Sequence, residues 1–309
     1  MELAIITAKQ VMILFFLILT GIAAAKTGIL PMESKKILSN LLVQLVVPAM
    51  VLNSYMMEFD PEIVGNLGKM LGYSTVFLLV GIVITFLITA LIPGIGRNLS
   101  ILRFGTMFSN AAYMGFPLIQ AIFGEEGLMY ASVYVTMFNI LLWTIGYAVV
   151  SGQSDFKKVA KAVLTNPVLY AVVLGLVIYL CRIPVPSVIQ SPLAYIGNMN
   201  TPISMLITGM LIAGVTDWKK LFNRQNGLAL FLRMVVTPAC CLGLCYLFSL
   251  HGIVVAVALL LEACPCAAIT PVFAVQFGHD EDLAAGMVVC STVLSIIILP
   301  VMALLLPIV

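Results

Sequence analysis

The sequence predicts an all-α integral membrane protein in which ten transmembrane helices form two inverted repeats of five. Composition is the first reason, because 62% of the residues are hydrophobic, 9% are charged and the mean hydropathy is +1.16. The second is a series of apolar runs that fills most of the chain, and the third is a match of the sequence to itself at one fixed offset. A membrane helix needs roughly 20 apolar residues, whereas barrel strands alternate polar and apolar residues, so a helical bundle is favoured.

The apolar runs define ten spans, and the connections between them are too short to fold as soluble domains. Any function must therefore lie within the membrane bundle. The first span also resembles a cleaved signal peptide, but a matching segment occurs deep in the chain, where no signal peptide can lie. In chain order, the spans are expected near residues 4–25, 36–57, 68–92, 98–124, 127–150, 164–181, 191–213, 227–249, 253–278 and 283–307.

The match of the sequence to itself pairs residues that are 154 positions apart. It places a first repeat at residues 1–152, a linker at 153–163 and a second repeat at 164–309. Because each repeat has five spans, an odd number, the second repeat enters the membrane from the opposite side. The match brings three helix-disrupting residues of the first half into register with the same residue types in the second: Gly21 with Gly175, Pro48 with Pro202, and Pro117 with Pro271.

Lysine and arginine residues in the loops predict the orientation, because cytoplasmic loops are the richer in both. Both termini and the loops with Lys9, Lys69 and Arg182 are then extracytoplasmic, and the linker is cytoplasmic. The cytoplasmic loops hold eleven basic residues: Lys26, Lys35, Lys36, Arg97, Arg103, Lys157, Lys158, Lys161, Lys219, Lys220 and Arg224.

The fourth span carries polar and helix-disrupting residues inside the stretch FSNAAYMGFPLIQAIFG, residues 108–124. Pro117 lacks a backbone N–H and Gly115 relaxes the chain beside it, so unwinding is expected around residues 112–117. Pro265 and Pro271 occupy the same zone of the ninth span. Helix N-termini freed there can bind an anion and freed carbonyls a cation, an arrangement typical of secondary transporters, although each proline could also form an ordinary kink.

Four polar residues within the spans are candidates for function. Glu262, near the middle of the ninth span, is predicted to carry a proton or bind sodium, with a structural glutamic acid as the alternative. Arg233 could pair with Glu262 or with an acidic substrate, or its side chain could reach the cytoplasmic interface. Asn110 can donate a hydrogen bond to a carboxylate. Asn139, in the fifth span, is a weaker candidate.

Two stretches resemble the auxin efflux carrier family, which includes plant auxin exporters and bacterial permeases for malate and malonate. SNAAYMGFPL is similar to its fourth-helix signature, and ACPCAAITPVFAVQFGHDEDLAAGMVVCSTVLSIIILP is similar to its last two helices. The resemblance implies that helices 4 and 9 cross and that a transport domain moves against a scaffold in an elevator-type mechanism. The long central loop of the plant exporters is missing, which indicates a prokaryotic member in the plasma membrane.

The predicted function is secondary transport of small organic anions, most simply carboxylates. The wider architecture is similar to the sodium-coupled bile acid symporters and the sodium/proton antiporters, so a coupling proton and a coupling Na+ both stay open. A homodimer is compatible with the sequence. The substrate site is expected to comprise Asn110, Tyr113, Gly115, Pro117, Asn139, Pro265, Thr270 and Pro271.

Other function classes find less support in the sequence. An intramembrane hydrolase needs two membrane aspartates or a Ser/His pair at depth, and neither is predicted, so no catalytic residues are assigned. The cysteines lack zinc spacing, and nucleotide-binding motifs are absent, so no metal, cofactor or nucleic-acid partner is expected. Two alternatives stay open: a sodium-coupled symporter of larger amphipathic acids and a membrane receptor without transport.

Overall fold

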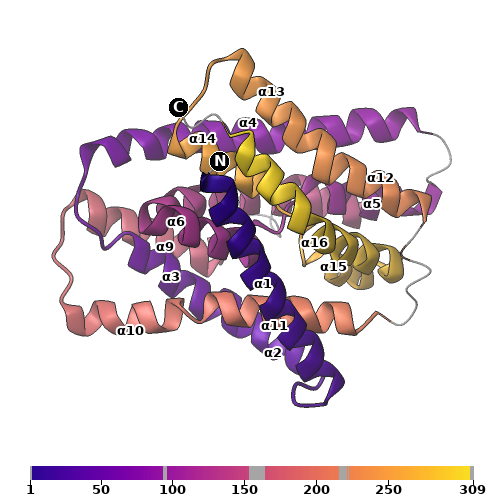
Figure 1. The fold of residues 1–309 in the computed structure, drawn as a ribbon, viewed down its shortest axis with the longest axis horizontal. Coiled ribbons are helices and arrows are strands. Elements are labelled where there is room, and N and C mark those ends of the chain that lie inside the picture. Colours follow the sequence, from indigo (N-terminus) through magenta and orange to yellow (C-terminus); the bar gives the residue numbers. More distant parts are fainter. Residues whose placement is uncertain (1, 93–95, 153–163, 216–220, 222, 307–309) are drawn as a thin grey trace.

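The computed structural model describes residues 2–92, 96–152, 164–215, 221 and 223–306 (Figure 1). Within these ranges the chain is helical apart from turns, short extended segments and one isolated antiparallel bridge between Ser109 and Cys266. The predicted linker at 153–163 lies outside the described residues.

The first half of the chain follows the order of spans that the sequence predicts. Gly124, with a left-handed φ of 63°, kinks α6 at the expected boundary between the fourth and fifth spans, and glycine adopts this conformation without steric cost. The elements are α1 (Glu2–Lys26), α2 (Ser34–Leu41), the π-helix η1 (Leu42–Val46), α3 (Val47–Ser54), α4 (Pro61–Leu91), η2 (Gly96–Asn98), α5 (Leu99–Met107), the π-helix η3 (Ala111–Gly115), α6 (Phe116–Leu141), the π-helix η4 (Leu142–Gly146) and α7 (Tyr147–Ser151).

The second half repeats this pattern of long and divided helices. Its longest interruption separates α14 from α15, in the predicted ninth span. The elements are α9 (Pro167–Leu180), α10 (Ser187–Gly197), α11 (Asn200–Ala213), α12 (Arg224–Phe231), the π-helix η6 (Leu232–Val236), α13 (Thr237–Leu247), α14 (Ile253–Glu262), α15 (Thr270–Phe277) and α16 (Glu281–Leu304).

Six helical stretches of the described chain are long and apolar enough to cross a membrane. Two further apolar helices, α9 and α14, are shorter. The protein is therefore an all-helical, multi-pass membrane protein, and the count of ten spans stays a prediction. The six stretches are Leu3–Lys26, Ser34–Ser54, Pro61–Leu91, Ala111–Ser151, Arg224–Leu247 and Glu281–Leu304.

Prolines account for three of the π-helical segments. Pro48, Pro117 and Pro238 each lie two residues after η1, η3 and η6, respectively. A proline cannot donate to the carbonyl four residues before it, and its ring clashes with that carbonyl. The wider i→i+5 turn of a π-helix accommodates both effects, so these helices continue past the proline.

Close contacts between α1 and α11 depend on glycine (Figure 1). A Cβ atom on Gly209 would lie 2.3 Å from the Ile18 carbonyl oxygen, and one on Gly21 would lie 2.7 Å from the Leu206 carbonyl oxygen. Small residues of this kind let membrane helices approach closely.

A second contact joins α3 and α9, where a Cβ atom on Gly175 would lie 2.5 Å from the ring of Tyr55. Gly175 and Gly209 lie 154 positions after Gly21 and Tyr55. Two equivalent contacts therefore occur. In one, Gly21 of the first half meets Gly209 of the second, and in the other, Gly175 of the second half meets Tyr55 of the first.

Candidate functional site

Two helix interruptions meet in the centre of the buried core. The first follows α5 and runs through Phe108, Ser109 and Asn110, and the second spans residues 263–269 between α14 and α15. The Asn110 N–H donates to the Pro265 carbonyl (2.7 Å), and the Ala267 N–H donates to the Phe108 carbonyl (2.9 Å). These hydrogen bonds satisfy backbone groups that an unbroken helix would have paired internally. We call these two segments the paired breaks.

The first break lies before the residues where the sequence predicted it. Residues 112–117 are helical, and the chain is extended at Phe108 instead (φ −113°, ψ 128°). Pro117 lies within the continuous helix formed by η3 and α6, and the π-helical turn of η3 accommodates its missing N–H. Gly115 has a packing role, because a Cβ atom there would lie 2.5 Å from Leu261 Cδ2.

Arg233, in η6, is fully buried beside the paired breaks, so its side chain does not reach an interface as one reading of the sequence allowed. Its guanidinium donates to the carbonyls of Thr106 (3.5 Å) and Met107 (3.3 Å) at the end of α5. It also donates to the carbonyl of Cys264 (3.2 Å) and to that of Glu262 at the end of α14. One side chain thus caps the C-terminal ends of both half-helices, which carry partial negative charge.

Glu262 is the buried counter-ion of Arg233. The Arg233 guanidinium lies 2.9 Å from Glu262 Oε1, and the Tyr134 hydroxyl of α6 donates to Glu262 Oε2. Each carboxylate oxygen therefore accepts one hydrogen bond from a different element. The pairing of Arg233 with Glu262, which the sequence left open, is present, and Tyr134 is a participant that the sequence did not indicate.

Helix α4 closes the other side of this ion pair. A Cβ atom on Gly81 would lie 3.2 Å from Glu262 Oε1 and 3.1 Å from the Thr237 methyl group of α13. Any larger residue at position 81 would push against the carboxylate. Gly81 and Thr237 thus complete the enclosure, and the sequence gave no local signal for either.

Asn110 ends the first of the paired breaks. It immediately precedes η3 and is 4% exposed, and its Nδ2 has no hydrogen-bond partner within the described chain. The first amide groups of the helix that follows carry partial positive charge. A buried donor without an acceptor is costly, and an anionic oxygen would satisfy it.

The remaining predicted site residues take different places. Tyr113 is half-buried in η3, and its hydroxyl lies near Ser39 of α2. The Thr270 hydroxyl donates to the Ala267 carbonyl (2.6 Å), and Pro271 lies in the first turn of α15. Asn139 lines a small recess with Thr136 of α6 and with Asn166, which immediately precedes α9, and no interaction in the described structure links it to the paired breaks.

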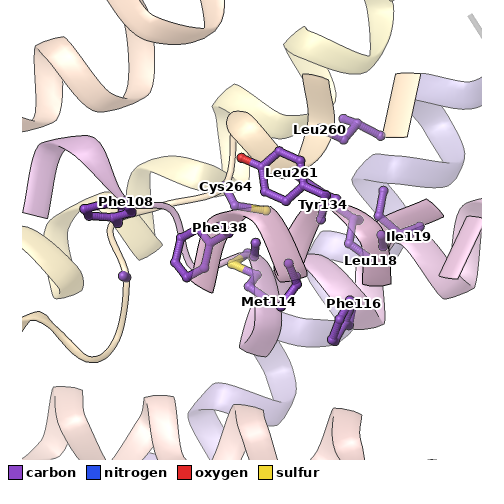
Figure 2. Packing of buried hydrophobic residues seen from close by; sticks show 14 of the residues in the cluster. Phe108, Met114, Phe116, Leu118, Ile119, Tyr134, Phe138, Leu260, Leu261 and Cys264 are labelled. Atoms are coloured by element: carbon purple, nitrogen blue, oxygen red, sulfur yellow. The ribbon is translucent and has the colours of Figure 1, made fainter. Parts of the chain in front are cut away.

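Apolar side chains pack around Phe108 and Cys264, which belong to the paired breaks (Figure 2). Phe108 contacts Phe138 edge to face with ring centroids 5.5 Å apart. Met114, Leu261 and Cys264 are also buried in this cluster. Within such a low-dielectric environment an ion pair interacts far more strongly than at a protein surface. Among the described residues, no group of three His, Cys, Asp or Glu side chains could hold a metal ion.

Comparisons with known proteins agree with this architecture. A family model described as "Membrane transport protein" matches residues 6–157 and 153–303. An uncharacterized transporter of Methanocaldococcus jannaschii is 25% identical over 94% of this chain and 95% of its own length. An uncharacterized transporter of Methanothermobacter thermautotrophicus is 27% identical over 62% of this chain, and the match spans 63% of that relative.

Proposed function

The chain belongs to the membrane transport protein family, and from this premise we propose that it is a secondary active transporter of small organic anions. The observation that carries the proposal is the unpartnered Nδ2 of Asn110 at the start of a helix beside the paired breaks. A substrate carboxylate placed there accepts from Asn110 and faces the partial positive charge of η3.

The order of the elements supports an inverted-repeat architecture. The contacts of Gly21 with Gly209 and of Gly175 with Tyr55 exchange the two halves at a constant offset, as a two-fold axis in the membrane plane requires. In this arrangement helices 4 and 9 cross at the paired breaks, and they move with their surroundings as the transport unit of an elevator.

The boundary of that unit is suggested by Tyr113, which lies in η3 directly after the first break and near Ser39 of α2. Both termini lie outside the cytoplasm, and the protein resides in a prokaryotic plasma membrane. A reporter that is active only in the cytoplasm is expected to be inactive when it is fused after residue 309. Activity of this fusion would contradict the orientation.

Glu262 is the proposed link between the substrate site and an energy source. It is one of two charged residues that are buried among those described, and its partner Arg233 touches both half-helices. A change in the protonation state of the Glu262 carboxyl group would therefore alter the contacts of Arg233 with the ends of α5 and α14.

The test uses the purified protein and a set of mono- and dicarboxylates, with malonate and malate as first probes. A bound anion raises the melting temperature because it binds only the folded state. Concentrative uptake into proteoliposomes then separates a transporter from a receptor. Asn110→Ala is expected to lose at least tenfold in affinity, while Asn139→Ala, outside the paired breaks, stays near wild type. The absence of stabilisation by any carboxylate, together with the absence of uptake, would refute the proposal.

A further inference from the structure

We propose that Arg233 is a built-in cation that takes the place of a coupling sodium ion at the paired breaks, so that sodium takes no part in transport. The consequence for transport rests on the proposed function, but the position of the cation can be tested without any substrate.

The groups around the guanidinium are those of a cation site. Interrupted membrane helices bind Na+ through carbonyl oxygens of unwound segments and of half-helix C-terminal ends. Here the carbonyls of Thr106, Met107, Glu262 and Cys264, together with Glu262 Oε1, all accept hydrogen bonds from Arg233. Five oxygen atoms from two different half-helices thus converge on one covalently attached cation.

Charge balance leaves no place for a second cation. Within the described part of the chain, Arg233 and Glu262 are the only fully buried charged residues, and they form one neutral pair. A sodium ion at these oxygens would lie beside the guanidinium, without a further carboxylate to compensate it. In a low-dielectric interior the repulsion between two such charges is severe.

The packing around the pair gives the same answer. On the α4 side, an added methyl group at Gly81 would already lie 3.2 Å from Glu262 Oε1. On the α6 side, the Tyr134 hydroxyl occupies the second carboxylate oxygen. Both contacts restrict the room for an ion beside the carboxylate.

Two consequences follow for the mechanism. Proton coupling and exchange of one anion for another remain as energy sources, and a sodium gradient does not. In addition, the cation that bridges the two half-helices cannot diffuse away from the site, because it is part of the chain.

The same geometry predicts the effect of emptying the site. Arg233→Ala removes the guanidinium and leaves the oxygens facing a cavity with the charge of Glu262. This variant is expected to melt at a lower temperature than wild type and to be restabilised, in a saturable way, by millimolar guanidinium and by Na+. Arg233→Met fills the same space with an apolar chain and is the matched control that neither cation should restore.

The experiment measures melting temperatures of the full-length protein in detergent, without any carboxylate, while NaCl replaces KCl at constant ionic strength. For wild type, the expected result is no shift up to 100 mM Na+. A saturable stabilisation of wild type by Na+ would overturn the proposal, even if neither variant can be purified. Failure of guanidinium to restore a folded Arg233→Ala would overturn it as well.

This outcome is independent of the carboxylate screen. If no carboxylate binds but guanidinium restores Arg233→Ala, the proposed function fails and the built-in cation stands. If carboxylates bind and wild type is stabilised by Na+, the proposed function stands and the built-in cation fails.

Discussion

Replacing Glu262 with glutamine tests the ion pair most directly, because it removes one charge and keeps the shape of the side chain. In the wild-type protein both carboxylate oxygens accept, one from Arg233 and one from Tyr134. Glutamine offers one accepting oxygen and one donating NH2 group. The oxygen can accept from Arg233, and the NH2 group can donate to the Tyr134 hydroxyl, which is also an acceptor. The substitution therefore removes mainly the negative charge.

The magnitude follows from the burial of both partners, which are 0% exposed. Removing one member of a buried ion pair leaves an uncompensated charge and costs about 3–5 kcal/mol of stability. The four carbonyl contacts of Arg233 offset only part of this cost, because carbonyl dipoles do not neutralise a full charge. Glu262→Gln is therefore expected to lower the melting temperature markedly as well as to impair transport.

The assay is a double-mutant cycle on detergent-purified protein, with Arg233→Met as the second substitution. If the two side chains interact as described, the double variant loses less stability than the two single variants combined. It still melts below wild type, because the carbonyls at the ends of α5 and α14 lose their donor. Additive losses would refute the ion pair, and a wild-type melting temperature for Glu262→Gln would refute the argument from burial.

Three further substitutions test the surroundings of the paired breaks. Tyr134→Phe leaves a buried oxygen without its donor and should cost about 1–3 kcal/mol, whereas Tyr147→Phe should change the melting temperature little; equal effects would contradict the assigned hydrogen bond. Gly115→Ala overpacks the core and should lower the free energy of unfolding by about 1–3 kcal/mol. Gly243→Ala, with open space around it, serves as the control. A stable and active Gly115→Ala would show that η3 can shift away from Leu261. Pro117→Ala should keep both its fold and its transport rate within about threefold of wild type, because the chain is unwound at Phe108 to Asn110, before η3 and the proline; abolished uptake would show that the proline itself is needed.

Much of the fold could be predicted from the sequence, because membrane burial imposes a simple rule. Apolar runs of about the bilayer thickness predict helices, and the described helices appear in the predicted order. The kink of α6 at Gly124 falls where the sequence separates the fourth and fifth spans. These features depend on residues that are close together in the chain.

The position of the first break could not be predicted in this way. A proline in a helical stretch suggests a break at the proline, but a π-helical turn before the proline can accommodate it. The chain is unwound at Phe108 to Asn110 instead, and the helix formed by η3 and α6 continues past Pro117. The π-helix η3 between them has no sequence signal except the proline that follows it.

The candidate site, like the first break, could be predicted only in part, as the Arg233–Glu262 ion pair shows. Glu262 and Arg233 are notable in the sequence because charged residues are rare within membrane spans. Their roles are set by partners that are distant in the chain, such as Tyr134, whose hydroxyl contacts Glu262 across 128 positions. Tyrosine is unremarkable in a membrane helix, and only the three-dimensional packing distinguishes this one.

The neutrality of the Arg233–Glu262 pair constrains what a substrate can bring to the paired breaks. A monocarboxylate at Asn110 adds one negative charge to a buried region that already balances. In a low-dielectric environment that charge is costly unless a proton accompanies it or another anion leaves. Protonation of Glu262 would free Arg233 to balance the substrate instead, and the region would again be neutral. For the proposed carboxylate site, substrate binding would then depend on the charge state of Glu262, with Arg233 as the fixed charge that both must balance.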